Sequence, residues 1–163
     1  MRIGARRLSA VIAGLLVVVA VVAATITYVR WRAAGVAHPI APPAGAVVPD
    51  FAGPGYQEDV SVRSLLVARS LRNDRGKATV RIYEMPPGSP WLRSRQTVAT
   101  QLDHWEQIGD CADNPEATLV ECAWREPTRW WPREVALTMV RPRPAKPGQA
   151  DRIFVIIGSG LGD

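Results

Sequence analysis

The run Leu8–Val29, LSAVIAGLLVVVAVVAATITYV, decides how this chain is organised. Its 22 residues include no charged side chain. A helix rises about 1.5 Å per residue, so this run spans roughly 33 Å, enough to cross a hydrocarbon core of about 30 Å. The run therefore predicts a single transmembrane helix, with everything after it on one side of a membrane.

The flanks of this run help to distinguish an anchor from a cleaved signal peptide. Arg2, Arg6 and Arg7 suit the basic start of either. The apolar run exceeds the about 7–15 residues of a signal peptide, and residues 28–32, YVRWR, have the aromatic and basic character of a membrane interface. We expect an uncleaved anchor over residues 8–32, with cleavage near Val22–Ala24 or burial as a soluble helix as alternatives.

Charge predicts the orientation and excludes one class of partner. Residues 1–49 hold five arginines and no acidic residue, whereas basic and acidic side chains balance over residues 50–163, so the net charge of +5 flanks the apolar run. Three arginines precede the apolar run and two follow it, and the more basic flank of a membrane helix tends to stay in the cytoplasm. This bias places residues 1–7 inside and the C-terminal part outside. Since the rest of the chain carries no basic excess, we expect no nucleic-acid partner. The preference for arginine over lysine, 18 to 2, is typical of GC-rich bacterial coding.

The two cysteines, Cys111 and Cys122, predict one disulfide in an oxidising compartment. Two unpaired buried thiols are the alternative. Their spacing does not match a redox C-x-x-C motif, and the chain has only two histidines. We therefore expect no metal site and no cofactor.

A change in composition separates a linker from a folded domain. Residues 33–59 hold five prolines and four glycines, which predicts a semi-extended spacer with a solvated His38 and with Phe51 and Tyr56 docked at its end. Residues 60–163 are enough for one modest core.

The pattern of the domain predicts an α+β fold. Strands are expected at residues 60–71, 78–83, 118–125, 134–140 and 152–157, with the first two forming a hairpin and the last one central in the sheet. One helix should begin at Ser89-Pro90 and end at Gly109. The expected order is ββαβββ, one helix on a mostly antiparallel sheet.

Tryptophans and one histidine are the candidate functional residues. Trp91, Trp105 and Trp124 fall on apolar faces and are expected in the core. Trp130 and Trp131 are adjacent in a Pro-bounded connection, where both rings cannot easily be buried in one core.

Arg129 stands beside this tryptophan pair, and aromatic residues next to arginine are typical of binding hot spots. We therefore expect Arg129, Trp130 and Trp131 to form a binding site, with packing on the sheet edge and the linker as the alternative. His104 is the one candidate general base of the domain, but the sequence shows no nucleophile motif to accompany it. Residues 158–163, GSGLGD, resemble a phosphate loop, yet no helix follows, so we expect a flexible tail.

These patterns favour a membrane-anchored binding or accessory module of the bacterial cell envelope. An envelope protein is the expected partner, ahead of cell-wall glycan. The alternative is an anchored or secreted envelope enzyme of unknown chemistry that uses His104.

Overall fold

The computed structural model describes residues 2–51, 56–71, 78–114, 116–142 and 151–161. The chain divides into two compact units, residues 1–34 and residues 35–163.

The first unit is the helix α1, Arg2–Ala34. Its segment Leu8–Ala34 has a mean hydropathy of 2.7 and is long and apolar enough to cross a membrane. The hydroxyls of Thr25 and Thr27 each donate, at 2.8 Å, to the backbone carbonyl four residues earlier. These polar atoms are therefore satisfied within the helix, as a lipid environment requires.

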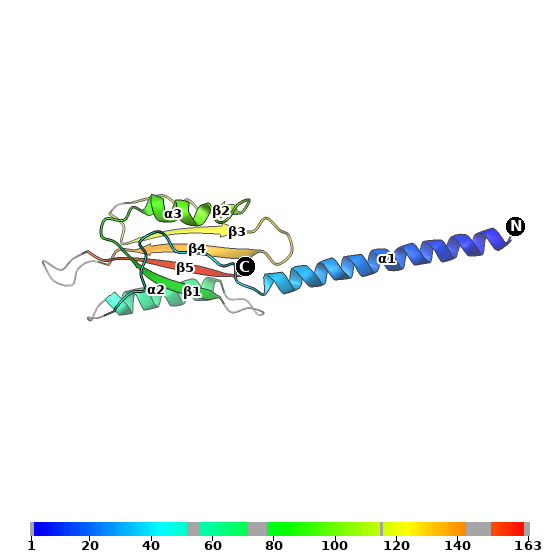
Figure 1. Cartoon of the computed structure of the whole chain (residues 1–163), viewed down its shortest axis with the longest axis horizontal. Coiled ribbons are helices and arrows are strands. Elements are labelled where there is room, and N and C mark those ends of the chain that lie inside the picture. Colours follow the sequence, from blue (N-terminus) through cyan, green and yellow to red (C-terminus); the bar gives the residue numbers. More distant parts are fainter. Residues whose placement is uncertain (1, 52–55, 72–77, 115, 143–150, 162–163) are drawn as a thin grey trace. The chain divides into compact units, whose positions relative to one another are not determined.

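The second unit is a five-stranded sheet with helices on both faces (Figure 1). All neighbouring strands are antiparallel, and their order in the sheet is β1-β5-β4-β3-β2. The elements in chain order are α2 Tyr56–Ser70, β1 Thr79–Met85, α3 Trp91–Ala99, β2 Glu106–Ile108, β3 Leu119–Arg125, β4 Arg133–Val140 and β5 Ile153–Leu161.

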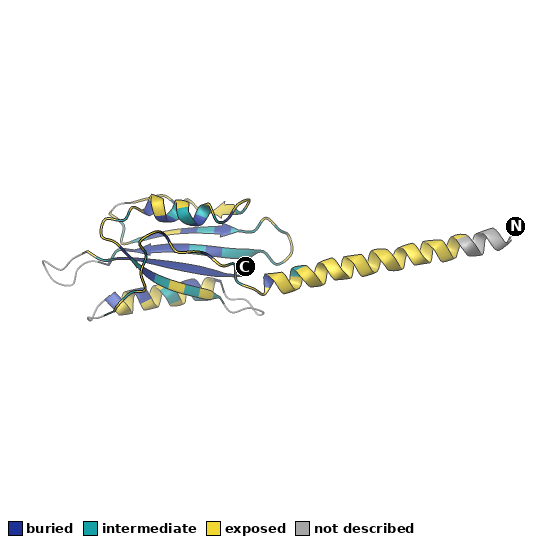
Figure 2. Cartoon of the chain, in the orientation of Figure 1, coloured by how far each residue is buried: buried dark blue, intermediate teal, exposed yellow. Residues whose placement is uncertain are grey.

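Strand β5 is buried along its whole length, as its apolar sequence predicted (Figure 2). Phe154 and Ile156 pack on the face that α2 covers. The residues that alternate with them pack on the other face, with Trp91 and Val98 of α3. Because both faces of β5 need apolar neighbours, the run IFVII has no polar position.

Residues 60–71, predicted as a strand, lie instead mainly in helix α2. Tyr56, Val60 and Val67 are its buried residues, at intervals of four and seven, so they share one helical face. Glu58 and Asp59 lie in its first turn, where negative charge stabilises a helix. The expected hairpin is therefore wrong: β1 pairs with β5, and the order of this unit is αβαββββ.

The helix predicted from Ser89 to Gly109 is also too long. Helix α3 ends at Ala99, and Glu106–Ile108 form the short strand β2. The Ser89 hydroxyl donates to the carbonyl of Pro86 rather than capping the helix, and Pro90 occupies the N-cap. A turn with His104 in the left-handed region (φ 66°) redirects the chain so that β2 can pair with β3.

Residues 35–51, part of the predicted linker, lie against the sheet. The amide of His38 donates to the Ser159 hydroxyl at 2.8 Å, and Val47 and Glu84 exchange two backbone hydrogen bonds of 2.9 and 2.8 Å. His38 is only half-exposed, with its ring 5.2 Å from that of Trp105. The second compact unit comprises residues 35–163, so it includes these residues as well as those of the predicted domain.

The end of the predicted linker docks as expected, because Phe51 and Tyr56 both place their rings about 6 Å from Phe154. The predicted C-terminal tail differs. Residues 158–161 are buried members of β5, and residues 162–163 lie outside the described part of the chain.

Candidate functional site

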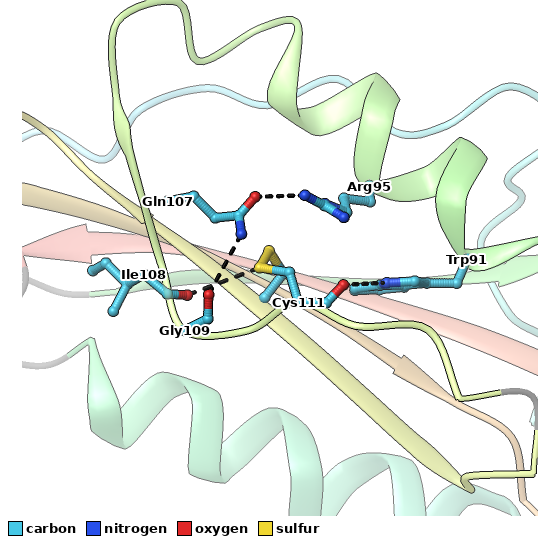
Figure 3. Close-up of a disulfide and its surroundings, with 7 residues drawn as sticks. Trp91, Arg95, Gln107, Ile108, Gly109 and Cys111 are labelled. Carbon is cyan, nitrogen blue, oxygen red and sulfur yellow. Dashed lines mark hydrogen bonds between the residues drawn. A yellow bond between two sulfur atoms is a disulfide. The ribbon is translucent and has the colours of Figure 1, made fainter.

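A disulfide joins Cys111 to Cys122, as the sequence predicted. It ties the loop after β2 to strand β3. A helix that ended at Gly109, as the sequence predicted, would have made this bridge a link between the helix end and the sheet. The Trp91 indole donates to the Cys111 carbonyl at 3.2 Å (Figure 3). Gln107 accepts a hydrogen bond from Arg95 at 2.7 Å. The bridge and these bonds hold α3, β2 and β3 together, and a disulfide is typical of an oxidising compartment.

The hairpin between β3 and β4 is braced by two ion pairs at its base. Arg125 pairs with Glu134 across the ladder at 2.6 Å. Arg133 donates two hydrogen bonds to the Glu126 carboxylate, at 3.1 and 3.2 Å. Two-pronged arginine–carboxylate pairs fix orientation as well as distance, so the Arg133–Glu126 pair helps to hold the two strands together at the base of this hairpin.

The tip of the hairpin, residues 127–132, brings together the three predicted binding residues. Trp130 is 65% exposed. Arg129 is exposed, and Trp131 is half-buried with its backbone in the left-handed region at φ 50°. The two indole rings are 6.1 Å apart and tilted by 54°. The tip therefore presents the indole of Trp130 to solvent, whereas Trp131 is partly covered.

The three tryptophans expected in the core differ in burial. Trp91 and Trp124 are buried. Trp105 is half-buried against the core, and the Arg133 guanidinium lies 5.6 Å from its ring centre. This cation–π contact joins the base of the hairpin to the turn before β2.

His104 lies on an exposed turn. Its imidazole is 3.0 Å from the Asp103 carboxylate, and the two side chains are 87% and 83% exposed. A general base also needs a positioned nucleophile or second acid. No such group is brought to His104 by a contact in the described part of the chain.

The residues that the structure describes contain no cluster of three or more histidine, cysteine or acidic side chains that could hold a metal ion. Both cysteines are used by the disulfide.

A groove beside α2 is a second candidate site, and the sequence did not predict it. Helix α2 packs on β1 and β5, and the same face of β4 and β3 borders two adjoining depressions of about 690 and 490 Å³. Both depressions include Arg63 and Leu66 of α2. The spacing of Val62, Leu65 and Leu66, all exposed, would have indicated a second apolar strip had residues 60–71 been read as a helix.

The walls of this groove combine apolar and polar side chains, and acidic residues stand at its borders. Leu119, Val140 and Ala136 line it from the sheet. In the described part of the chain, the charged side chains that line the two depressions are Glu58, Asp59, Glu121 and Arg63.

The described residues thus form a helix of membrane-spanning length and a disulfide-bonded α+β unit with two exposed apolar features. Comparison of the chain with protein-family models, curated proteins and solved structures gives no match.

Proposed function

We propose that this chain is a membrane-anchored binding module of the bacterial cell envelope, with its α+β unit outside the cell membrane. Its partner is an amphipathic helix of another envelope protein, bound in the groove beside α2. The observation that carries the proposal is the strip of sheet that α2 leaves uncovered.

The width of the sheet supports a helix as the occupant. Neighbouring strands lie about 4.8 Å apart, so the axes of five strands span about 19 Å. A helix with its side chains is about 10 Å wide. Among the described elements of this unit, α2 is the helix that packs on this face, with its main contacts to β1 and β5, and Thr138 and Val140 of β4 are buried on it as well. The strip that remains, over β3 and β2, is about 10 Å wide, which is the width of one more helix.

The side chains of the groove suggest the character of that helix. An apolar stripe would cover the exposed side chains of Leu66 and Ile108 and the half-buried Leu119, and removing such surface from water is the main driving force for an association of this kind. Among the residues that the structure describes, acidic side chains outnumber Arg63 three to one around the groove. Basic residues beside the apolar stripe of the partner would complement this charge and speed its encounter with the module.

The disulfide and the charge around α1 support the location. An oxidised pair is rare in the cytoplasm, and the arginines before the apolar run favour a cytoplasmic N-terminus. An enzyme that uses His104 has less support, because that side chain and Asp103 are both largely exposed. Cell-wall glycan is the second choice of partner and would stack on Trp130.

Photocrosslinking in the native membrane tests the groove. A photoreactive amino acid at Val62 or Leu66 should crosslink the full chain to a single protein, and the crosslinked peptide should be an amphipathic helix with basic flanks. The same probe at Leu92, which is 61% exposed on α3, is the control and should give no such product. Equal products from Leu92, or products with a second copy of this chain, contradict the proposal.

Membrane extraction tests the anchor separately. The full chain should stay in the membrane pellet during alkaline carbonate treatment, since a spanning helix is held by its whole apolar length. A mature chain that begins near Thr25 in mass spectrometry would show cleavage instead.

A further inference from the structure

The hairpin tip and the start of the second unit lie at the same end of the sheet. The amide of His38 bonds to Ser159, and Ser159 pairs with Val135 in the β4–β5 ladder. Two residues from this pair, toward the same end of the sheet, Arg133 pairs with Leu161. Residues 127–132 then project beyond the last backbone bond of the hairpin, from the Glu126 amide to the Arg133 carbonyl.

The chain between Ala34 and His38 is short. Ala34 ends α1, and His38 is the fourth residue after it. Four residues extend at most about 14 Å. This limit follows from covalent geometry alone and holds for any direction in which the chain leaves the helix.

The hairpin projects beyond the point where this tether joins the sheet. At about 3.3 Å per residue, Arg133 lies about 7 Å beyond the level of Ser159, and residues 127–132 lie further out again. The tether of about 14 Å joins the sheet at this same end, through the bond of His38 to Ser159. When this end of the sheet faces the membrane that α1 crosses, the tip reaches the interface before the sheet does.

The chemistry of the tip suits the headgroup region. An indole joins a large apolar surface to one N–H donor, and tryptophan is enriched at membrane–water interfaces for that reason. Trp130 exposes most of its surface, and Arg129 beside it is also exposed. The two acids at the base, Glu126 and Glu134, are each paired with an arginine, which lowers their repulsion of lipid phosphates.

We propose that the tip of the β3–β4 hairpin inserts Trp130 into the headgroup region of the membrane that anchors this chain, with Arg129 beside the lipid phosphates. This inference rests on the membrane anchor of the proposed function. A tether alone lets the α+β unit rotate, whereas a second contact restricts that rotation. The contact would hold the groove beside α2 in a fixed direction for a partner helix.

Fluorescence quenching in lipid nanodiscs tests the contact without any partner protein. The full chain carries Trp31→Phe, which removes the tryptophan of α1, and the lipids carry a nitroxide on the headgroup. We expect strong quenching that is mostly lost in the further variant Trp130→Phe. The matched control adds Leu92→Trp to that double variant, because Leu92 has nearly the exposure of Trp130 but lies at the start of α3, toward the other end of the sheet. This new indole should remain unquenched.

Each outcome separates this inference from the proposed function. Quenching that is unchanged by Trp130→Phe, or equally strong from the indole at position 92, overturns the membrane contact. Failure of the chain to enter nanodiscs would instead overturn the anchor. Crosslinking from Leu66 is measured independently, so the groove is judged without reference to the tip.

Discussion

Arg152 and Glu84 are 68 residues apart in the chain and form a two-pronged ion pair. The Nε and one Nη of Arg152 each donate to a different carboxylate oxygen of Glu84, at 2.6 Å. The same Nη donates to the carbonyl of Asp50 at 2.7 Å, and the guanidinium lies about 5 Å from the rings of Tyr56 and Phe154. One side chain thus joins β5, the outer strand β1, the docked segment before α2 and the start of α2.

The first prediction concerns the pH dependence of stability. The hydrogen bond from Arg152 lowers the pKa of Glu84 below its ordinary value of 4.5, although burial opposes this. A carboxyl with a lowered pKa stabilises the fold above its unfolded pKa, and the stabilisation is lost as the pH falls through the folded pKa. In urea titrations Glu84→Gln should cost about 1–3 kcal/mol at neutral pH.

The same variant should also lose less stability than the wild type as the pH falls below 4.5. Glu116→Gln, at an exposed glutamate, is the control and should keep the wild-type pH profile. Parallel profiles for wild type and Glu84→Gln would contradict this role of the ion pair.

The second prediction concerns the disulfide. Cys111 and Cys122 are 11 positions apart, and closing a loop of this size stabilises a protein by roughly 3 kcal/mol in the chain-entropy model. Replacing both cysteines by serine should therefore lower the melting temperature by on the order of 10 °C. Reduction of the wild type should produce a similar fall and leave the double variant unchanged. Recovery of two free thiols from the native membrane would contradict both the bridge and the outside location.

The third prediction separates the exposed from the buried tryptophans. Trp130→Ala should melt within a few degrees of the wild type, because exposed positions usually change stability by no more than about 0.5 kcal/mol. Trp91→Ala should cost about 3–5 kcal/mol or prevent folding, since this indole is fully buried and bonded to the Cys111 carbonyl. Similar losses in the two variants would show that Trp130 is a core residue and remove the basis for a contact at the tip.

The sequence predicted the strands whose burial alternates. In β3, the alternating residues Val120, Cys122 and Trp124 are all buried, and the uniformly apolar start of β5 correctly indicated cover on both faces. The helix that precedes β1 could not be predicted from such a pattern. Helix α2 carries two apolar strips, one buried and one exposed, so its pattern matches neither a simple amphipathic helix nor a strand.

The candidate sites also differ in whether a local sequence pattern could predict them. Two adjacent tryptophans in a Pro-bounded connection predicted that the two rings would not both be buried, because local geometry cannot easily bury both, and Trp130 is indeed exposed; a binding role for this tip stays a prediction. The groove depends on which strands α2 covers, and the docking of residues 35–51 depends on bonds such as that of His38 to Ser159, 121 positions away. Such long-range pairings leave no periodic signal in a single sequence.

The last prediction explains two glycines that had suggested a flexible tail. Gly158 and Gly160 lie on β5 where α2 comes closest to it. A Cβ at Gly160 would lie 2.6 Å from the backbone oxygen of Leu71, whereas a Cβ at Gly158 would meet the ends of the Val67 and Leu71 side chains at 2.5 and 2.6 Å. A backbone atom cannot rotate away, but the end of a leucine can.

In urea unfolding, Gly160→Ala should therefore cost more than Gly158→Ala, within the range of about 1–3 kcal/mol typical of overpacking. Leu71→Ala provides the internal control, because it removes one of the two side-chain clashes at Gly158, leaving that with Val67, and leaves the backbone clash at Gly160. Its effect should be less than additive with Gly158→Ala and nearly additive with Gly160→Ala. Equal and fully additive losses at the two positions would mean that the glycines serve the strand itself, and not the close approach of α2.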